Sequence, residues 1–205
     1  VVTADGKVYT AGDLTTEVSI QSISKVFTMA LVMEQQTPDA ILTTIGADAT
    51  GMRFNSIVSV EWSYKGLGGS KLESAAEMNP LVNPGAITAT SMVKGNTRAE
   101  IWANIANFHN AAAGRPLTVL KDVYDSEAAT NQRNQAIGML MYAYGYIKDN
   151  PLQAVDLYTE QCSIGVNARD LATMAATLAF GGVNPVTKKQ VMKSADVPEV
   201  LAVMA

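Results

Sequence analysis

Cysteine and histidine are nearly absent from this sequence of 205 residues, which contains one of each, Cys162 and His109. One cysteine can form neither an internal disulfide nor a multi-cysteine metal site, and a Ser-His-Asp triad or a zinc site would have to be built around His109 alone. The apolar helical spacing around Cys162 indicates a buried, inert thiol. His109 lies near the end of an amphipathic helical pattern, which indicates a surface or half-buried side chain. A hydrolase with this composition therefore needs a base other than histidine.

Concentrated positive charge is also missing. Lys and Arg number 15 and Asp and Glu number 19, so the formal net charge is −4, and the longest basic run is Lys188-Lys189. Nucleic acids and anionic membranes bind concentrated basic surfaces, so we expect neither as a partner. The longest apolar stretches, 26–33 and 136–147, are too short to span a bilayer and contain polar residues. The N-terminus has neither the basic region nor the apolar core of a signal peptide. These features favour a small-molecule or protein partner.

Signals for strands and helices predict a short β-segment followed by a mostly helical chain. Asp5-Gly6 separates two β-prone segments, 1–3 and 7–10, and predicts a hairpin because glycine tolerates the positive φ of a tight turn. Residues 51–83 contain several glycines and two Asn-Pro turns, and we expect an extended loop there with at most one strand at 57–62. Start and stop signals predict helices from Ser22 to Met33, between Thr37 and Gly46, over 84–94, 97–113 and 126–147, and over 187–193 and 197–205. They also predict one helix that starts at Asn150-Pro151, and one that is capped by Asn167 with Asp170 and ends at Gly181-Gly182.

Two Ser-x-x-Lys patterns are candidates for nucleophilic chemistry. A lysine can remove the proton of a serine hydroxyl if burial keeps its amine neutral, and this spacing puts both side chains on one helical face. Lys94, three residues after Ser91, lies at a helix C-terminus, where it stays charged. Ser22 and Lys25 lie at a helix start, before an apolar run and beside backbone amides that can stabilise an oxyanion. From the pattern alone, the plain alternative is an N-cap serine with Lys25 in solvent.

The residues around Ser22 are the first of several motifs. The segment Ser19–Phe27 resembles the nucleophile motif of the bacterial serine-dependent glutaminases, which share the fold of the serine β-lactamases. Further segments resemble motifs of that family in the family's order, and together they cover essentially the whole chain. They are Arg53–Val58, Asn79–Ile87, Ser126-Glu127 with Arg133-Asn134, and Leu157-Tyr158 followed by Gln161-Cys162-Ser163.

The resemblance implies a mixed α/β fold of the serine β-lactamase type, seen here mainly as its helical lobe with an N-terminal hairpin. It implies hydrolysis of L-glutamine to L-glutamate and ammonia through an acyl-enzyme on Ser22, with Lys25 as the general base and without a metal or an organic cofactor. It also implies that Tyr158 bonds the substrate or assists proton transfer. We expect such an enzyme to be a cytoplasmic homodimer or homotetramer.

Three more residues match the family's substrate-binding positions, namely Asn83, Glu127 and Asn134. Glu127 is suited to pair with the α-ammonium of glutamine, and the two asparagines can donate amide hydrogens to the α-carboxylate or to the side-chain carbonyl while staying neutral. Glu127 and Asn134 are seven residues apart, so one long helix could present both on one face. The plain alternatives are a helix-dipole partner for Glu127 and turn residues for the asparagines.

The match to the family is not complete. Family members begin with a helical segment that is not found here, and they continue beyond the position of Ala205 into sheet strands with a Lys-Ser-Gly motif. We therefore expect residues 1–205 to be a single catalytic domain that is incomplete at both ends and lacks the C-terminal strands. The loop at 63–77 is also longer than in common bacterial members. Two other functions stay open: a penicillin-recognising serine hydrolase of the same fold, and a non-catalytic helical interaction protein.

Overall fold

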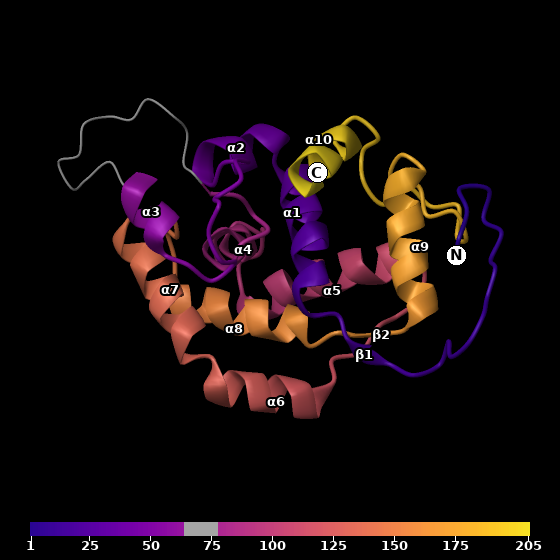
Figure 1. The fold of residues 1–205 in the computed structure, drawn as a ribbon, viewed down its shortest axis with the longest axis horizontal. Helices are drawn as coiled ribbons and strands as arrows, with labels where there is room; N and C mark the ends of the chain where they lie inside the picture. Colours follow the sequence, from indigo (N-terminus) through magenta and orange to yellow (C-terminus); the bar gives the residue numbers. More distant parts are fainter. Residues whose placement is uncertain (64–77) are drawn as a thin grey trace.

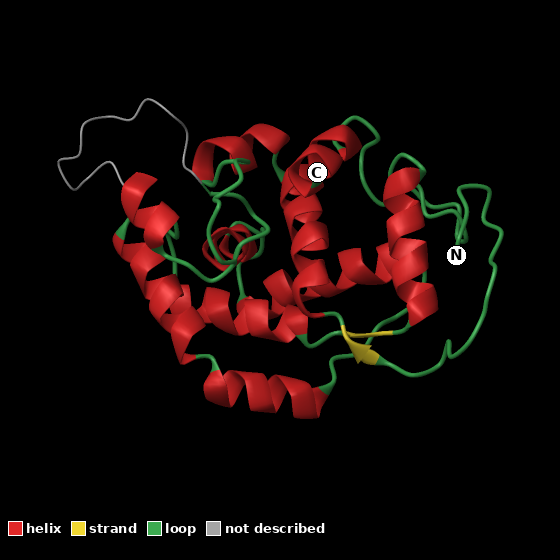
Figure 2. Cartoon of the chain, in the orientation of Figure 1, coloured by secondary structure: helices red, strands yellow, loops and turns green. Residues whose placement is uncertain are grey.

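The computed structural model describes residues 1–63 and 78–205, and most of these residues are in helices (Figures 1 and 2). The long loop predicted at 63–77 lies outside the described residues except for Ser63. In chain order the elements are β1 (Val18–Ser19), a 3₁₀ turn η1 (Gln21–Ile23), α1 (Ser24–Gln35), α2 (Pro38–Thr44), α3 (Val58–Ser63), α4 (Asn83–Ser91), α5 (Arg98–Ala113), α6 (Lys121–Thr130), α7 (Gln132–Ala143), α8 (Pro151–Cys162), β2 (Gly165–Val166), α9 (Ala168–Ala179) and α10 (Val197–Met204).

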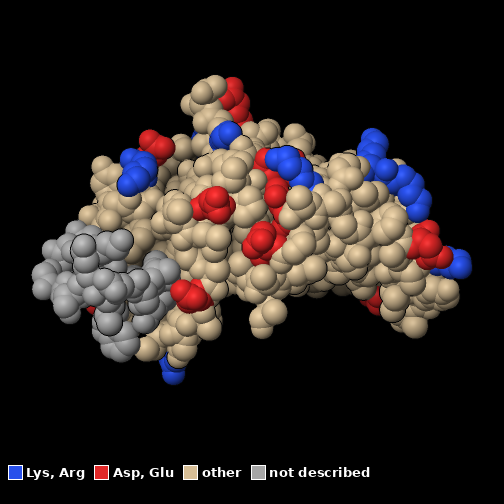
Figure 3. All heavy atoms as spheres, turned by 90° about the horizontal axis from the view of Figure 1, so that it is seen from above, with Lys and Arg blue, Asp and Glu red and all other residues tan. Residues whose placement is uncertain are grey.

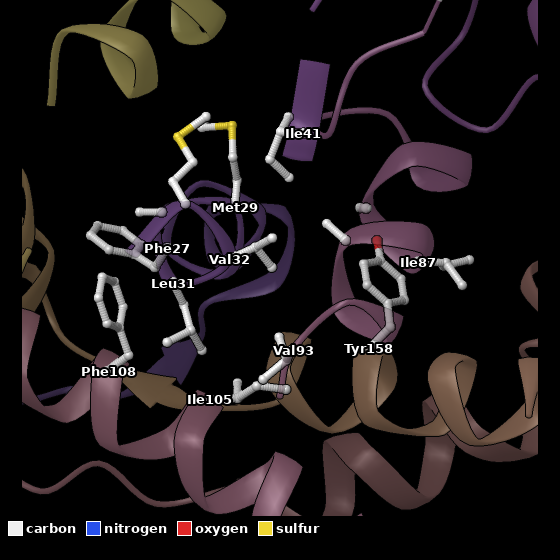
Figure 4. Close-up of a cluster of buried hydrophobic side chains, with 14 of the residues drawn as sticks. Phe27, Met29, Leu31, Val32, Ile41, Ile87, Val93, Ile105, Phe108 and Tyr158 are labelled. Atoms are coloured by element: carbon white, nitrogen blue, oxygen red, sulfur yellow. The ribbon is translucent and has the colours of Figure 1, made fainter. Parts of the chain in front are cut away.

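Helix α1 is the centre of the core because it is apolar on nearly all sides. It packs against α2, α4, α5 and α10, and a helix that is hydrophobic all round is stable only when neighbours cover it. Figure 4 shows Phe27 of α1 beside Phe108 of α5, and Ile41 of α2 near Met29. On the other side of α1, α4 packs against α7 and α8. The first turn of α1 is thereby enclosed by helices from distant parts of the sequence.

A two-stranded antiparallel sheet joins the segment before α1 to the segment after α8. Val18 pairs with Val166 and Ser19 with Gly165, and the Ile20 amide donates to the Ile164 carbonyl at 2.8 Å. Ile164 also forms an isolated bridge with Val119, just before α6. These contacts bring the start of α1, the end of α8 and the approach to α6 together at one place (Figure 1).

Several local predictions are confirmed. The N-terminal hairpin is present as a single bridge between Val2 and Val8. Its turn is at Ala4-Asp5, and Gly6 follows with a positive φ of 87°. The helix predicted between Thr37 and Gly46 is α2. The Asn150 side chain caps α8. At the start of α9, Asn167 and Asp170 form a reciprocal capping box, which satisfies backbone amides that the helix itself leaves unpaired.

The single helix predicted over 126–147 is wrong. The chain there forms two helices, α6 and α7, which meet at Asn131. The Asn131 side chain donates to the Thr159 hydroxyl at 3.1 Å and accepts from the Gln135 amide at 2.6 Å. Asparagine often exchanges helical geometry for such side-chain bonds. This break separates the two predicted substrate-binding residues of the segment onto different helices.

Three other expectations about secondary structure need correction. Residues 58–63 form helix α3, where at most a strand at 57–62 was expected. No helix forms over 187–193, because the Asn184 side-chain oxygen accepts from the amides of Val186 and Thr187 and holds a turn. Strand β2 was not predicted, since two residues are too few to show an alternating pattern.

His109 is completely buried, contrary to the expectation of a surface or half-buried side chain. It continues the apolar stripe of α5 formed by Ile105, Phe108 and Ala112, a spacing that faces the core. Its Nδ1 pairs with the Ile105 carbonyl at 2.8 Å, and its ring packs against Phe27. Burial lowers the pKa of His109 to about 4, against the opposing effect of the Ile105 and Ser24 carbonyls. The side chain is therefore a neutral part of the core.

The charged residues are scattered over the face of the molecule that Figure 3 shows. On the face shown in Figure 3, the basic side chains lie in small separate groups among acidic and uncharged residues. This face thus has no continuous basic surface over its described residues. Among the residues that the structure describes, no helix is both long and apolar enough to cross a bilayer.

Candidate active site

Five of the six predicted site residues line one pocket of about 170 Å³. They come from five elements: η1, the start of α4, α6, α7 and α8. The sixth, Lys25, lies in the first turn of α1. The residues that line the pocket are Gln21, Ser22, Phe54, Asn83, Glu127, Asn134, Tyr158, Thr159 and Cys162.

Lys25 is buried, with 3 % of its surface exposed. Its Nζ donates a hydrogen bond to the Asn83 side-chain oxygen at 2.8 Å, and the ring of Tyr158 lies 6.0 Å from it. Burial lowers the pKa of this amine, and the neighbouring Cys162 opposes the shift only in part. A neutral asparagine holds the lysine without supplying a counter-charge, so the environment favours the uncharged, basic amine.

Asn83 joins both sides of the pocket. Its side-chain oxygen accepts from Lys25 and, at 3.3 Å, from the Tyr158 hydroxyl, while its side-chain nitrogen donates to the Asn134 oxygen at 3.0 Å. Its position depends on Gly85, because a Cβ there would lie 2.0 Å from the Asn79 carbonyl oxygen. The Asn-Pro-x-x-Asn-x-Gly pattern thus allows α4 to begin close against its own preceding turn.

Ser22 lies in the 3₁₀ turn η1, just ahead of α1 and not within that helix as predicted. Its side chain is exposed at the mouth of the pocket. The preceding residue, Gln21, has a φ of 50°, which is unusual for a residue with a side chain. The Ser24 hydroxyl donates to the Gln21 carbonyl at 2.7 Å and supports this turn. The geometry turns Ser22 outward while Lys25 points into the protein.

Tyr158 and Cys162 project from one face of α8, four residues apart. Burial raises the pKa of Tyr158, as does the neighbouring Cys162, whereas the Ser22 hydroxyl acts in the opposite direction. Cys162 is buried, as predicted, although it lines the pocket, and burial also raises the pKa of its thiol. Both groups are neutral near pH 7, so Tyr158 can act as a hydrogen-bond donor and Cys162 is no thiolate nucleophile.

Glu127 and Asn134 face the pocket from different helices. The prediction that one helix presents both is wrong, because α6 ends before Asn131 and α7 begins after it. The tertiary packing nevertheless places both in the same pocket. Glu127 is exposed, and the Gln21 side-chain amide donates to its carboxylate at 3.4 Å. The one carboxylate of the lining therefore remains open to a cationic group.

Four lining residues are not among the predicted site residues: Gln21, Phe54, Thr159 and Cys162. Gln21 and Thr159 directly adjoin predicted site residues, and Cys162 follows Tyr158 by one helical turn, so their neighbourhood was the available signal. Phe54 belongs to the segment 53–58, and its carbonyl accepts from the Asn83 amide at 2.6 Å. No residue-level pattern marks Phe54 as a pocket residue.

The second Ser-x-x-Lys pattern lies elsewhere. Lys94 is exposed and its ammonium donates to the Gln35 carbonyl, while the Ser91 hydroxyl donates to the Thr88 carbonyl at 2.7 Å. Neither residue lines the pocket. Within residues 1–63 and 78–205, no group of three or more His, Cys, Asp or Glu is placed to hold a metal ion.

Comparison with known proteins agrees with this architecture. A family model described as Glutaminase matches residues 1–205. Curated glutaminases of Brucella canis and Colwellia psychrerythraea are 45% and 44% identical to the chain over 204 residues and cover 100% of it. The chain spans 61% and 62% of the length of these two relatives.

Solved structures show the same fold. The structure of a probable glutaminase matches with a TM-score of 0.92 and 41% identity, over 99% of this chain and 62% of its own. A Bacillus glutaminase matches with a TM-score of 0.88 over 99% of this chain and 65% of its own, and at 24% identity it supports the fold alone. The serine β-lactamase-like fold predicted from the motifs is confirmed. The chain belongs to the glutaminase family.

Proposed function

We propose that the protein hydrolyses the side-chain amide of L-glutamine to give L-glutamate and ammonia. The observation that carries this proposal is the buried amine of Lys25, one turn from an exposed serine. The serine lies at a pocket lined by an exposed carboxylate and by the side-chain amides of two asparagines. A buried lysine without a counter-charge is a competent base. The three polar groups of glutamine, an α-ammonium, an α-carboxylate and a neutral amide, match the chemistry of the lining.

The proposed reaction has two acyl-transfer steps. Lys25 takes the hydroxyl proton as the Ser22 Oγ attacks the side-chain carbonyl carbon, and a tetrahedral oxyanion forms. The proton then passes to the amide nitrogen, the carbon–nitrogen bond breaks, and ammonia leaves with the glutamyl group held as an ester on Ser22. Water attacks this ester with its proton going to Lys25, and glutamate is released as the proton returns to Ser22. The cycle needs no cofactor.

Recognition of the substrate is divided among the remaining residues. Glu127 pairs with the α-ammonium, a charge-assisted contact that contributes on the order of 1.5–3 kcal/mol. Asn83 and Asn134 offer amide hydrogens to the carboxylate or the carbonyl without adding charge. Tyr158, neutral because it is buried, donates its hydroxyl hydrogen to the substrate or assists the proton transfer at the leaving group.

Ammonia release from glutamine tests the proposal in the full-length protein. Lys25→Arg lowers kcat/KM by about 10²–10⁴-fold, because a guanidinium stays protonated. Ser22→Ala has a similar effect, and the double variant is hardly worse, since the two groups act as a unit. Lys94→Arg, in the second Ser-x-x-Lys pattern, is the matched control and leaves the rate unchanged. A Lys25→Arg enzyme with near-normal activity would contradict the mechanism.

Hydrolysis of a chromogenic β-lactam is the second arm of this experiment. Turnover of the β-lactam without ammonia release would identify a penicillin-recognising hydrolase on the same scaffold. A protein that does neither would be a non-catalytic member of the family. The predicted homodimer or homotetramer and the cytoplasmic location stay predictions, which light scattering of the purified protein and cell fractionation can check.

A further inference from the structure

Helix α6 carries Glu127 at the edge of the molecule. None of its residues is fully buried, and Figure 1 shows it as a separate layer outside α8. Two of its side-chain bonds are internal and do not fix its position, namely those from Lys121 to Asp125 and from Thr130 to the Ser126 carbonyl. Since an apolar interface normally fixes the position of a helix, the position of Glu127 must depend on other contacts.

Tyr124 supplies such a contact one helical turn before Glu127. Its hydroxyl donates to the Asp156 carboxylate of α8 at 2.6 Å. Within the described residues, this is the one side-chain hydrogen bond that joins α6 to α8. Residues three apart lie on the same helical face, so the bond acts on the same face of α6 that presents Glu127. The bond to Asp156 also raises the pKa of Tyr124 to about 12, so its hydroxyl keeps its proton near pH 7.

Arg98 holds the other side of the Asp156 carboxylate. Its guanidinium donates to the second oxygen through Nε at 2.8 Å and Nη2 at 2.5 Å, and it also pairs with Glu160 at 2.6 Å. About two thirds of each of the Arg98 and Asp156 side chains is shielded from solvent. The two-donor geometry orients the carboxylate, so the acceptor that Tyr124 meets is fixed from α5 as well as from α8.

We propose that the cluster of Arg98, Tyr124 and Asp156 is a positioning device for Glu127 and thereby sets the affinity for the substrate's α-ammonium. The proposal rests on the proposed function, because it assumes that Glu127 binds that ammonium. None of the three residues lines the pocket. They act through α6, so their loss moves the carboxylate without removing any group that contacts the substrate.

Tyr124→Phe in the full-length protein tests this proposal, because it removes only the hydroxyl. Misplacing a binding group raises KM for glutamine on the order of tenfold and leaves kcat nearly unchanged. Two diazo-ketone reagents that label the nucleophile, one with and one without an α-amino group, provide the second readout. Labelling by the amino reagent slows on the order of tenfold, and labelling by the des-amino reagent stays the same. The ratio of the two rates is independent of how much protein is folded.

Tyr142→Phe is the matched control, because Tyr142 is an exposed tyrosine on the neighbouring helix α7. It leaves both labelling rates unchanged. A double-mutant cycle completes the test: in the Glu127→Gln background, Tyr124→Phe causes no further loss. Equal slowing of both reagents, an unchanged KM, or a full additional loss in that background would overturn the proposal. A wild-type protein that neither releases ammonia nor labels would instead contradict the proposed function.

Discussion

At the scale of single residues, Asn83 sets the electrostatics of the buried amine. Its neutral oxygen accepts from Lys25 at 2.8 Å and from Tyr158 at 3.3 Å. A carboxylate in the same place would accept the same bonds but would stabilise the ammonium form. An asparagine therefore satisfies the lysine and still allows its pKa to fall, which an aspartate cannot do.

Asn83→Asp tests this reasoning through the pH dependence of the activity. For the wild type, the proposed mechanism predicts that kcat/KM rises with pH as the amine loses its proton, and that the rise lies below the ordinary lysine pKa because burial lowers the pKa of Lys25. The new carboxylate raises the pKa of Lys25, so the rise moves to higher pH by about one to three units. Asn83→Ala removes the same hydrogen bonds without adding charge and gives no upward shift. Coincident profiles for the two variants would contradict the role given to Asn83.

His109 makes the stability of the fold depend on pH. Its pKa is about 4 in the folded protein and about 6.5 in an unfolded chain. Between these values the unfolded chain binds a proton that the folded protein does not. The contribution of His109 to the free energy of unfolding is therefore fully present above pH 6.5. It falls as the pH drops from 6.5 toward 4, by about 3 kcal/mol over this range.

His109→Gln removes this titrating group and isolates its effect. The difference in the free energy of unfolding between pH 7 and pH 4.5 should be smaller in the variant by about 2–3 kcal/mol. Urea unfolding at both pH values measures it, and comparison of the two proteins cancels the carboxylates that they share. No other histidine occurs in the sequence. An equal pH dependence in both proteins would show that His109 does not remain neutral when buried.

At the scale of elements, helix α7 contacts α8 and α4 closely because of Gly138. A Cβ at this position would lie 2.7 Å from the Val155 side chain and 3.3 Å from the Pro151 carbonyl oxygen. Val155 is buried and β-branched, so it has little freedom to move away. The glycine weakens the helix locally but permits the packing that holds Asn134 over the pocket.

Gly138→Ala separates helix propensity from packing. Alanine favours a helix by roughly 1 kcal/mol over glycine, yet we expect a net loss of about 1–3 kcal/mol in the free energy of unfolding because the added methyl overpacks the interface. Ala136→Gly, at an exposed position of the same helix, measures the difference in helix propensity between alanine and glycine without a change in packing. A stabilised Gly138→Ala protein would show that α7 and α8 can separate at no cost.

At the scale of the whole molecule, the pocket exists only when η1, α4, α6, α7 and α8 are assembled. No pair of these elements supplies the full set of polar groups. The unfolded chain therefore has no binding site, and a ligand that fills the pocket must stabilise the folded state by mass action.

Thermal unfolding of the Ser22→Ala protein with L-glutamine tests this linkage without turnover. At one hundred times Kd, the ligand contributes about 2.7 kcal/mol, which corresponds to a rise in Tm of about 5–10 °C for a domain of this size. Addition of Glu127→Gln to this protein raises the glutamine concentration needed for the same shift. A melting temperature that does not respond to glutamine would place the substrate site elsewhere.

Short sequence patterns were enough to predict several helix caps and turns correctly. The cap at Asn150, the capping box at Asn167 and the hairpin turn around Asp5 each depend on residues within a few positions of one another. The motif series also identified five of the residues that line the pocket. Sequence alone determined these features because their energies are decided by near neighbours or because the motifs identify a known family.

Other features were decided only by the tertiary structure. Asn131 ends α6 because Thr159, twenty-eight residues away, bonds its side chain, and His109 is neutral because α1 covers it. The low pKa of Lys25 likewise depends on burial by helices that its own segment does not contain. Such contacts join residues that are distant in the chain, and their energies outweigh local propensities of a few tenths of a kcal/mol. A local pattern therefore identifies the lysine and the serine as candidates, and only the packed helices give them the burial and exposure that the proposed base and nucleophile need.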